Sequence, residues 1–125
     1  VRVRAESAGY DVLPANRELA GAEVEMVDLD HRESRLRAAL ERVAEDYDYA
    51  LLDCPPSLSM LTLNGLVAAQ AVMIPMQCEY YALEGLSDLV NTIKKVRAHF
   101  NPGIEIEGLL RTMFDPRNNL ANDVS

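Results

Sequence analysis

The sequence predicts an α/β fold in which a mostly parallel sheet carries helices on both faces. Short apolar runs at residues 49–53 and 71–75 have the length of buried strands. Segments with apolar residues at helical spacing separate and follow them, and this alternation is typical of parallel sheets with helical crossovers. In such sheets ligands bind beyond the carboxyl ends of the strands, which here indicates residues 53–57, 75–81 and 112–117.

The amino-terminal half is predicted to hold two strands and two helices. Residues 10–14 are expected to form a short strand, after which Asn16 can cap a helix. Residues 33–46 give a clearer helical pattern, with apolar residues between Arg and Glu. The apolar run 49–53 ends in Asp53, and two prolines just beyond it should stop the strand.

The carboxyl-terminal half continues the alternation. Its expected elements are a helix at 61–70, a strand at 71–75, a helix at 83–100, a strand at 104–114 and the start of a helix at Asn118. The Asn-Pro-Gly sequence at 101–103 is expected to end the longest helix.

Length and composition exclude several classes of protein. The chain has 125 residues, which suits one domain, and it is 49% hydrophobic and 26% charged, as soluble globular proteins are. Its net charge of −8 argues against a protein that coats nucleic acid, although a local basic patch remains compatible with it. No apolar run approaches the roughly 18–20 residues of a membrane span, and no signal peptide is recognisable. Because the chain begins with Val1 rather than Met, we expect it to be a piece of a longer protein.

The two cysteines, Cys54 and Cys78, cannot form a disulfide scaffold or a four-thiolate zinc site, and they favour a reducing cytoplasm. Cys54 could be a nucleophile, but no His is close to it in the sequence, so a small buried thiol is the favoured interpretation. The basic residues Lys94, Lys95, Arg97 and His99 gather near the end of the longest predicted helix. They complement the helix dipole, and a DNA-facing role is the alternative.

Asp53 is the residue that most strongly indicates chemistry. An acid at the end of an apolar strand, followed by a turn, is the Walker B arrangement, in which the carboxylate holds a water molecule bound to Mg²⁺. The same pattern also fits an Asp that caps the following turn. From the strand and the acid alone, both interpretations stay open.

Strings of residues along nearly the whole chain resemble those of one protein family. They lie at residues 11–15, 19–23, 47–57, 61–64, 74–86, 106–115 and 117–120. The most specific of them reads Gln77-Cys78-Glu79-Tyr80-Tyr81-Ala82-Leu83-Glu84-Gly85-Leu86. These strings are similar to those of the ParA/Soj family of chromosome and plasmid partitioning ATPases, and the resemblance implies a P-loop NTPase-like fold.

The resemblance also implies roles for individual residues. Asp53 would be catalytic and would contact Mg²⁺ through water, and Cys54 would join the switch that responds to the γ-phosphate. The residues expected near the bound nucleotide are Pro55, Pro56, Thr112, Met113 and Asp115. Arg117 matches a position implicated in non-specific DNA binding, and a solvated loop charge is the alternative interpretation.

The chain departs from the family at the phosphate-binding loop. None of its six glycines precedes a lysine, and the lysines, Lys94 and Lys95, fall inside a predicted helix. Residues 1–125 are therefore expected to be the middle portion of an ATPase domain, without the P-loop or the last helices. This portion alone is expected to be inactive and to bind ATP weakly or not at all.

For the complete protein, the resemblance implies a cytoplasmic, nucleoid-associated ATPase that binds ATP and Mg²⁺. It would form a homodimer when ATP is bound, bind DNA non-specifically without any membrane, and respond to a ParB-type partner. Two alternatives stay open: a MinD-like positioning ATPase that works at a membrane through an amphipathic helix, and a non-catalytic binding module with the same fold.

Overall fold

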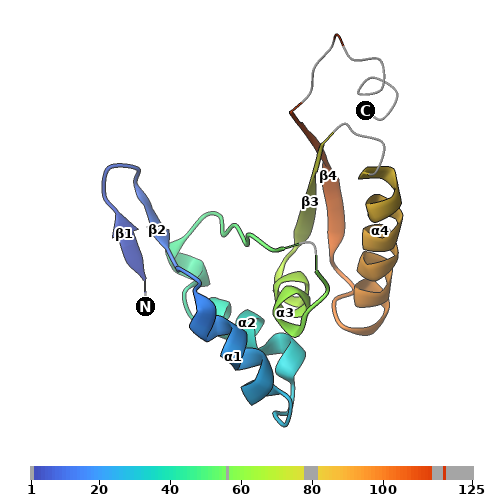
Figure 1. Ribbon diagram of the computed structural model, residues 1–125. Coiled ribbons are helices and arrows are strands. Elements are labelled where there is room, and N and C mark those ends of the chain that lie inside the picture. Colours follow the sequence, from blue (N-terminus) through green and yellow to red (C-terminus); the bar gives the residue numbers. More distant parts are fainter. Residues whose placement is uncertain (1, 56, 78–81, 114–116, 118–125) are drawn as a thin grey trace. The chain divides into compact units, whose positions relative to one another are not determined.

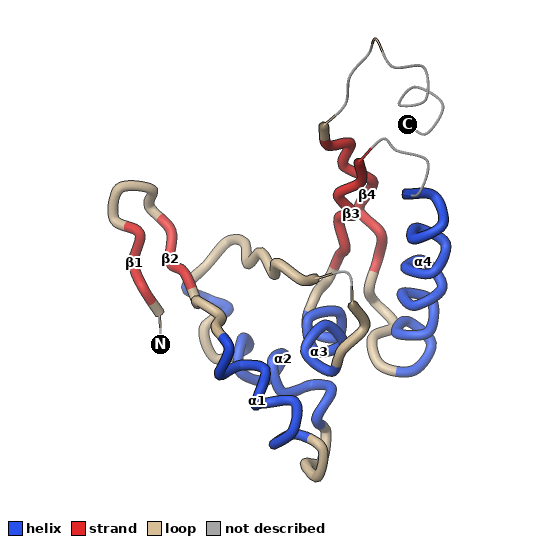
Figure 2. The backbone as a smooth tube through the Cα atoms, in the orientation of Figure 1, coloured by secondary structure: helices blue, strands red, loops and turns tan. Residues whose placement is uncertain are grey.

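The computed structural model describes residues 2–55, 57–77, 82–113 and 117, and for residues 82–84 it describes the backbone alone. The chain divides into two units, Val1–Arg32 and Glu33–Ser125. The smaller unit holds a hairpin and a helix, and the larger unit holds the parallel strands with their helices (Figures 1 and 2). The helix predicted to begin at Asn118 lies outside the described residues.

The smaller unit begins with a hairpin of β1 (Val3–Ala5) and β2 (Tyr10–Val12), which pair antiparallel. The strand predicted near residues 10–14 is therefore confirmed at Tyr10–Val12, but its partner was not predicted, because three-residue strands carry little periodic signal. Arg4 and Asp11 face each other across the ladder and form an ion pair at 3.1 Å. Gly9 has φ +74°, a left-handed conformation that glycine adopts at little steric cost, and it allows the turn.

Helix α1 (Arg17–Met26) follows the hairpin and starts as the sequence predicts. The side chain of Asn16 accepts a hydrogen bond from the backbone N–H of Glu18 at 2.9 Å. This bond satisfies one of the amide groups that have no partner within the first turn of a helix. The predicted cap is therefore confirmed.

The larger unit is built on two parallel strands, β3 (Ala71–Gln77) and β4 (Glu105–Thr112), joined by helix α4 (Ala82–His99). The register runs from Ala71 opposite Glu105 to Gln77 opposite Thr112, with an irregularity between Val72 and Met73. This strand–helix–strand unit confirms the predicted α/β class and its parallel strands. It also places the carboxyl ends of both strands at one edge (Figure 1).

Apolar side chains from α3 (Met60–Ala68), β3, α4 and the start of β4 form the core of this unit. Its buried members are Leu66, Val67, Ile74, Ile93, Val96 and Ile104. Within β3, Ile74 and Met76 are buried while Pro75 between them is exposed and Met73, just before Ile74, is 56% exposed, as the two-residue period of a strand requires. In the described part of the chain, α3 and α4 therefore pack on one face of the strand pair, and the other face keeps apolar side chains in solvent.

Helix α2 (Arg35–Glu41) is shorter than the predicted helix at 33–46. Turns of 3₁₀ helix flank it, η1 (Arg32–Ser34) and η2 (Ala44–Asp46). None of the α2 residues is buried, and short helices that bury little surface are marginally stable, which accounts for the difference. Helix α2 packs against α3, and the side-chain oxygen of Asn64 accepts a hydrogen bond from Leu36 N–H at 3.1 Å.

The predicted strand at 49–53 is wrong in this structure, where the segment has no regular secondary structure. Leu51 is 95% exposed and Tyr49 is 89% exposed, so the apolar run is not buried. A strand is stabilised by a neighbour that accepts and donates its backbone hydrogen bonds. Among the described residues, β3 and β4 pair with each other and no strand pairs with residues 49–53.

Asn101 connects the end of α4 to the end of α3. Its side-chain amide donates to the backbone carbonyls of Leu66, Val67 and Ala69, at 3.0, 3.0 and 2.8 Å. The carbonyls at a helix C-terminus have no partner within the helix, so this amide supplies the missing donors. Asn101 is also the first residue of the sequence that was predicted to end the longest helix, and α4 does end just before it, at His99.

Gly65 allows the loop after Asp53 to approach α3. A Cβ built at Gly65 would lie 3.0 Å from the sulfur of Cys54, which is closer than such atoms normally approach. The absence of a side chain at Gly65 therefore permits the sulfur of Cys54 to lie close to α3.

We expect Asn101→Ala to lower the free energy of unfolding of the intact protein by about 1–3 kcal/mol, because three carbonyls lose their donor. Urea denaturation followed by circular dichroism measures it. Asn91→Ala, at an exposed position of α4, is the matched control and should change the value by less than about 0.5 kcal/mol. Equal effects of the two substitutions would show that the Asn101 bonds do not stabilise α3.

We expect the effect of Gly65→Ala on the free energy of unfolding to depend on the side chain at Cys54. In the wild-type background the new methyl group meets the sulfur, which offsets the gain of about 0.5–1 kcal/mol that Ala normally brings to a helix. In a Cys54→Ala background that gain should reappear. A double-mutant cycle of unfolding free energies measures the coupling, and strictly additive values would contradict the contact.

Candidate functional site

The carboxyl ends of β3 and β4 form the edge where the sequence places a ligand. Gln77 and Thr112 are opposite each other at the last pair of the ladder. Met113 follows with φ +51° and is 80% exposed, so the chain turns sharply as it leaves the sheet. The structure therefore brings Thr112 and Met113 to the predicted edge, on the side of the sheet where α/β proteins bind ligands.

Asp53 is exposed and lies on the irregular segment that leads to α3 rather than at the end of a strand. Within the described part of the chain it makes no hydrogen bond or ion pair. Because Pro56 in the following turn lies outside the described residues, the interpretation of Asp53 as a cap for that turn stays a prediction. Its carboxylate remains available to a cation or to water.

Other predicted site residues fall in segments that the structure describes only in part. Pro55 is exposed and directly follows Cys54. Pro56 and Asp115 lie outside the described residues, as does Cys78. Arg117 is exposed, and the residues on both sides of it lie outside the description.

The surroundings of Cys54 disfavour its thiolate form. Burial of the sulfur raises its pKa above the ordinary value, and the negative charge of Asp53 raises it further. Cys54 is exposed as a whole residue, but its sulfur lies against α3 at Gly65, which explains why burial is the larger cause. Because the thiolate is the nucleophilic form, a raised pKa disfavours covalent catalysis by Cys54. The prediction of a small buried thiol is wrong for the residue as a whole, since Cys54 is exposed and only its sulfur comes close to α3.

The carboxylate of Asp53 fits the Mg²⁺ part of a nucleotide site, whereas these residues supply no group for the phosphates. Among the described residues, no group of three or more His, Cys, Asp or Glu could hold a metal ion. Mg²⁺ often keeps most of its waters and contacts a protein through one or two carboxylates, a role that the exposed Asp53 can fill. The phosphates would need a glycine-rich loop with a lysine, which is not found in these 125 residues.

Sequence reasoning missed three residues that shape this region: Asn64, Gly65 and Asn101. Asn64 is 3% exposed, accepts from Leu36 N–H, and donates to Met60 O at 2.9 Å. An Asn within the apolar helix pattern of residues 60–68 is a signal that could have indicated a buried hydrogen-bonding role.

None of the described helices combines the length and apolar character needed to cross a membrane.

Comparisons with known proteins agree with this geometry. A family model described as an AAA domain matches residues 1–106. The chain is 58% identical over 113 residues to the chromosome partitioning protein ParA of Myxococcus xanthus, covering 90% of this chain and 40% of that protein. It is 56% identical over 114 residues to the sporulation initiation inhibitor protein Soj of Bacillus subtilis, covering 91% and 45%.

A solved structure shares the fold. It is cobyrinic acid a,c-diamide synthase from Mycobacterium smegmatis with bound ADP and magnesium, 42% identical, with a TM-score of 0.92 over 98% of this chain and 50% of that chain. The chain thus spans about half the length of the relatives it matches. From the family match and these identities, the chain belongs to the AAA-domain family of ParA/Soj partitioning ATPases.

Proposed function

We propose that this chain is part of a longer ParA-type ATPase that binds ATP and Mg²⁺ and drives the partitioning of a chromosome or plasmid. The observation that carries the proposal is the identity of 56–58% to ParA and Soj over about nine-tenths of the chain. The likeness to the cobyrinic acid a,c-diamide synthase is weaker in sequence, at 42%, which favours partitioning over amide synthesis.

Asp53 is the residue of this chain to which we assign the magnesium ion. Its carboxylate is exposed and makes no hydrogen bond or ion pair within the described residues. Pro55, Pro56, Thr112, Met113 and Asp115 are proposed to lie around the nucleotide. The placement of Thr112 and Met113 at the carboxyl edge of the strands supports this assignment.

The exposed apolar face of the strand pair supports the view that further elements belong to the same domain. Met73 is 56% exposed, and Leu110, which is opposite Pro75, is 49% exposed. Parallel sheets are normally covered on both faces. The relatives, which are about twice as long, have residues beyond this chain that could cover it and supply the phosphate-binding loop.

For the whole protein we propose a cycle between two states. ATP favours a homodimer that binds DNA non-specifically, with Arg117 as one contact, and a ParB-type partner stimulates hydrolysis and release. ATP can shift the population only by the difference between its affinities for the two states. Such a protein works in the cytoplasm, on the nucleoid.

We expect Asp53→Asn in the intact protein to lower the rate of Mg²⁺-dependent ATP hydrolysis by about 100-fold or more, because a carboxylate that positions the metal is lost. Isothermal titration should show that ATP affinity becomes less dependent on Mg²⁺. Asp48→Asn, five positions earlier in the same segment, is the matched control and should retain nearly full activity. Equal activity of the Asp53→Asn protein and the control would refute the assignment.

We expect Arg117→Ala to weaken DNA binding by the intact, ATP-bound protein and to reduce the slope of log affinity against log salt by about one, as the loss of one phosphate contact predicts. ATP binding should not change. Arg37→Ala removes a charge from an exposed ion pair on α2 and serves as the control. If both variants bind duplex DNA like the wild type, Arg117 is not a DNA contact.

A further inference from the structure

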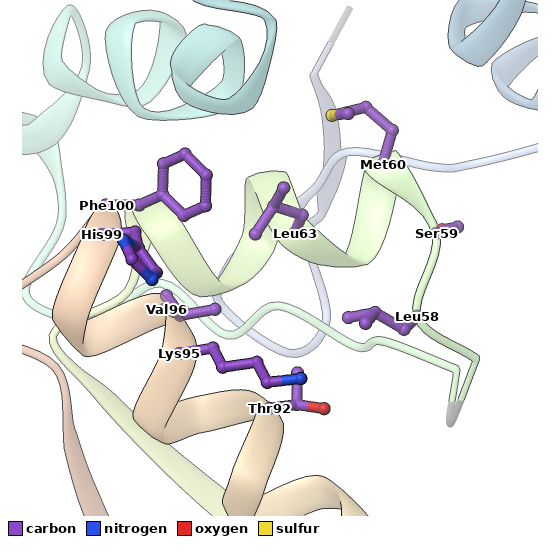
Figure 3. A pocket seen from close by; sticks show the side chains of 9 residues that line it. All are labelled: Leu58, Ser59, Met60, Leu63, Thr92, Lys95, Val96, His99 and Phe100. Carbon is purple, nitrogen blue, oxygen red and sulfur yellow. The ribbon is translucent and has the colours of Figure 1, made fainter.

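An apolar groove lies between the start of α3 and the second half of α4, away from the carboxyl edge of the strands. It encloses about 400 Å³. Figure 3 shows Leu58 and Leu63 on the α3 side and Val96 and Lys95 on the α4 side, around a common space. All its lining residues belong to the larger unit, within residues 33–125.

The groove combines exposed apolar side chains with others that belong to the core or pack against it. Its apolar lining consists of Leu58, Met60, Leu63, Val96 and Phe100. Leu58 is 65% exposed and Phe100 is 43% exposed, while Val96 is 3% exposed. Aromatic residues and Met, such as Phe100 and Met60 here, are enriched at protein–protein interfaces.

A lysine lines the groove in a chain that is acidic overall. Lys95 and His99 line it, and no acidic residue occurs between Asp88 and Glu105, although the chain carries 20 Asp and Glu in all. Within the described part of the chain, Lys95 forms no ion pair. A carboxylate beside the groove would lie near this cation.

We propose that this groove binds a peptide segment of a partner protein that presents apolar side chains next to at least one carboxylate. The apolar lining would bury the apolar side chains, and Lys95 would pair with the carboxylate. A groove between two helices is a recurring site for such segments. DNA fits less well, because phosphate contacts need no exposed Leu58 or Phe100 beside the cation.

The experiment selects peptides from a random 12-residue phage library on the intact protein, without assuming a sequence. We expect enriched peptides to combine Leu, Ile or Phe with Asp or Glu. For a synthetic, fluorescein-labelled enriched peptide, fluorescence anisotropy should give an affinity that Lys95→Glu weakens about 10-fold and that Phe100→Ala weakens to a similar degree.

Lys94→Glu is the matched control, since it makes the same charge change one position earlier on α4 and outside the groove. It should alter the affinity less than about twofold, and the circular dichroism spectrum and melting temperature should show that every variant folds.

Several results would overturn the proposal. No enrichment is the result expected if the rest of the protein fills the groove. Enrichment of basic peptides, equal weakening by Lys94→Glu and Lys95→Glu, or binding that is insensitive to Phe100→Ala would also contradict it. Light scattering adds a further one, since a dimer that Phe100→Ala dissociates would assign the groove to a second copy. Weaker binding of a 30-base-pair duplex by both lysine variants, without peptide binding, would assign α4 to DNA.

Discussion

The packing of α4 against one face of β3 is the constraint on which the rest of the larger unit depends. Ile93 of α4 and Ile104, just before β4, are 1% and 0% exposed, and Ile74 of β3 joins them in the core. Burial of these side chains holds the crossover helix on the strand pair and so keeps β3 and β4 parallel. The parallel arrangement in turn brings Gln77 and Thr112 to the same edge. Asn101 then fixes the end of α3 to this core through three backbone carbonyls.

The core positions Thr112 and Met113 of the candidate site, but it does not position Asp53. Thr112 and Met113 leave a hydrogen-bonded strand, so their place follows from the register. Asp53 lies on a segment without regular secondary structure, and the sulfur of the next residue, Cys54, comes close to Gly65 of α3. Because no strand positions it, Asp53 is exposed and makes no hydrogen bond or ion pair within the described residues. In the sequence it is still the residue that most strongly indicates chemistry.

Sequence patterns predicted the elements whose burial is periodic. The helix at 83–100 was predicted because its apolar stripe meets the core, and the observed bounds are Ala82–His99. The prediction of a strand at 49–53 was wrong because an apolar run indicates burial but does not show which strand would pair with it. No pairing strand is present among the described residues. Pairwise close approaches such as Cys54 to Gly65 leave no periodic signal, so they could not be predicted. The family was predictable because the string at 77–86 is specific, and the comparisons confirm it.

The central claim is that Asp53 serves the magnesium ion of a bound nucleotide. The most direct test is the structure of the intact protein with Mg²⁺ and a non-hydrolysable ATP analogue. We expect the carboxylate of Asp53 to accept a hydrogen bond from a water molecule on the metal, with Thr112 and Met113 on the same side of the sheet. A bound nucleotide whose magnesium ion is served by another carboxylate, with Asp53 facing bulk solvent, would contradict the account.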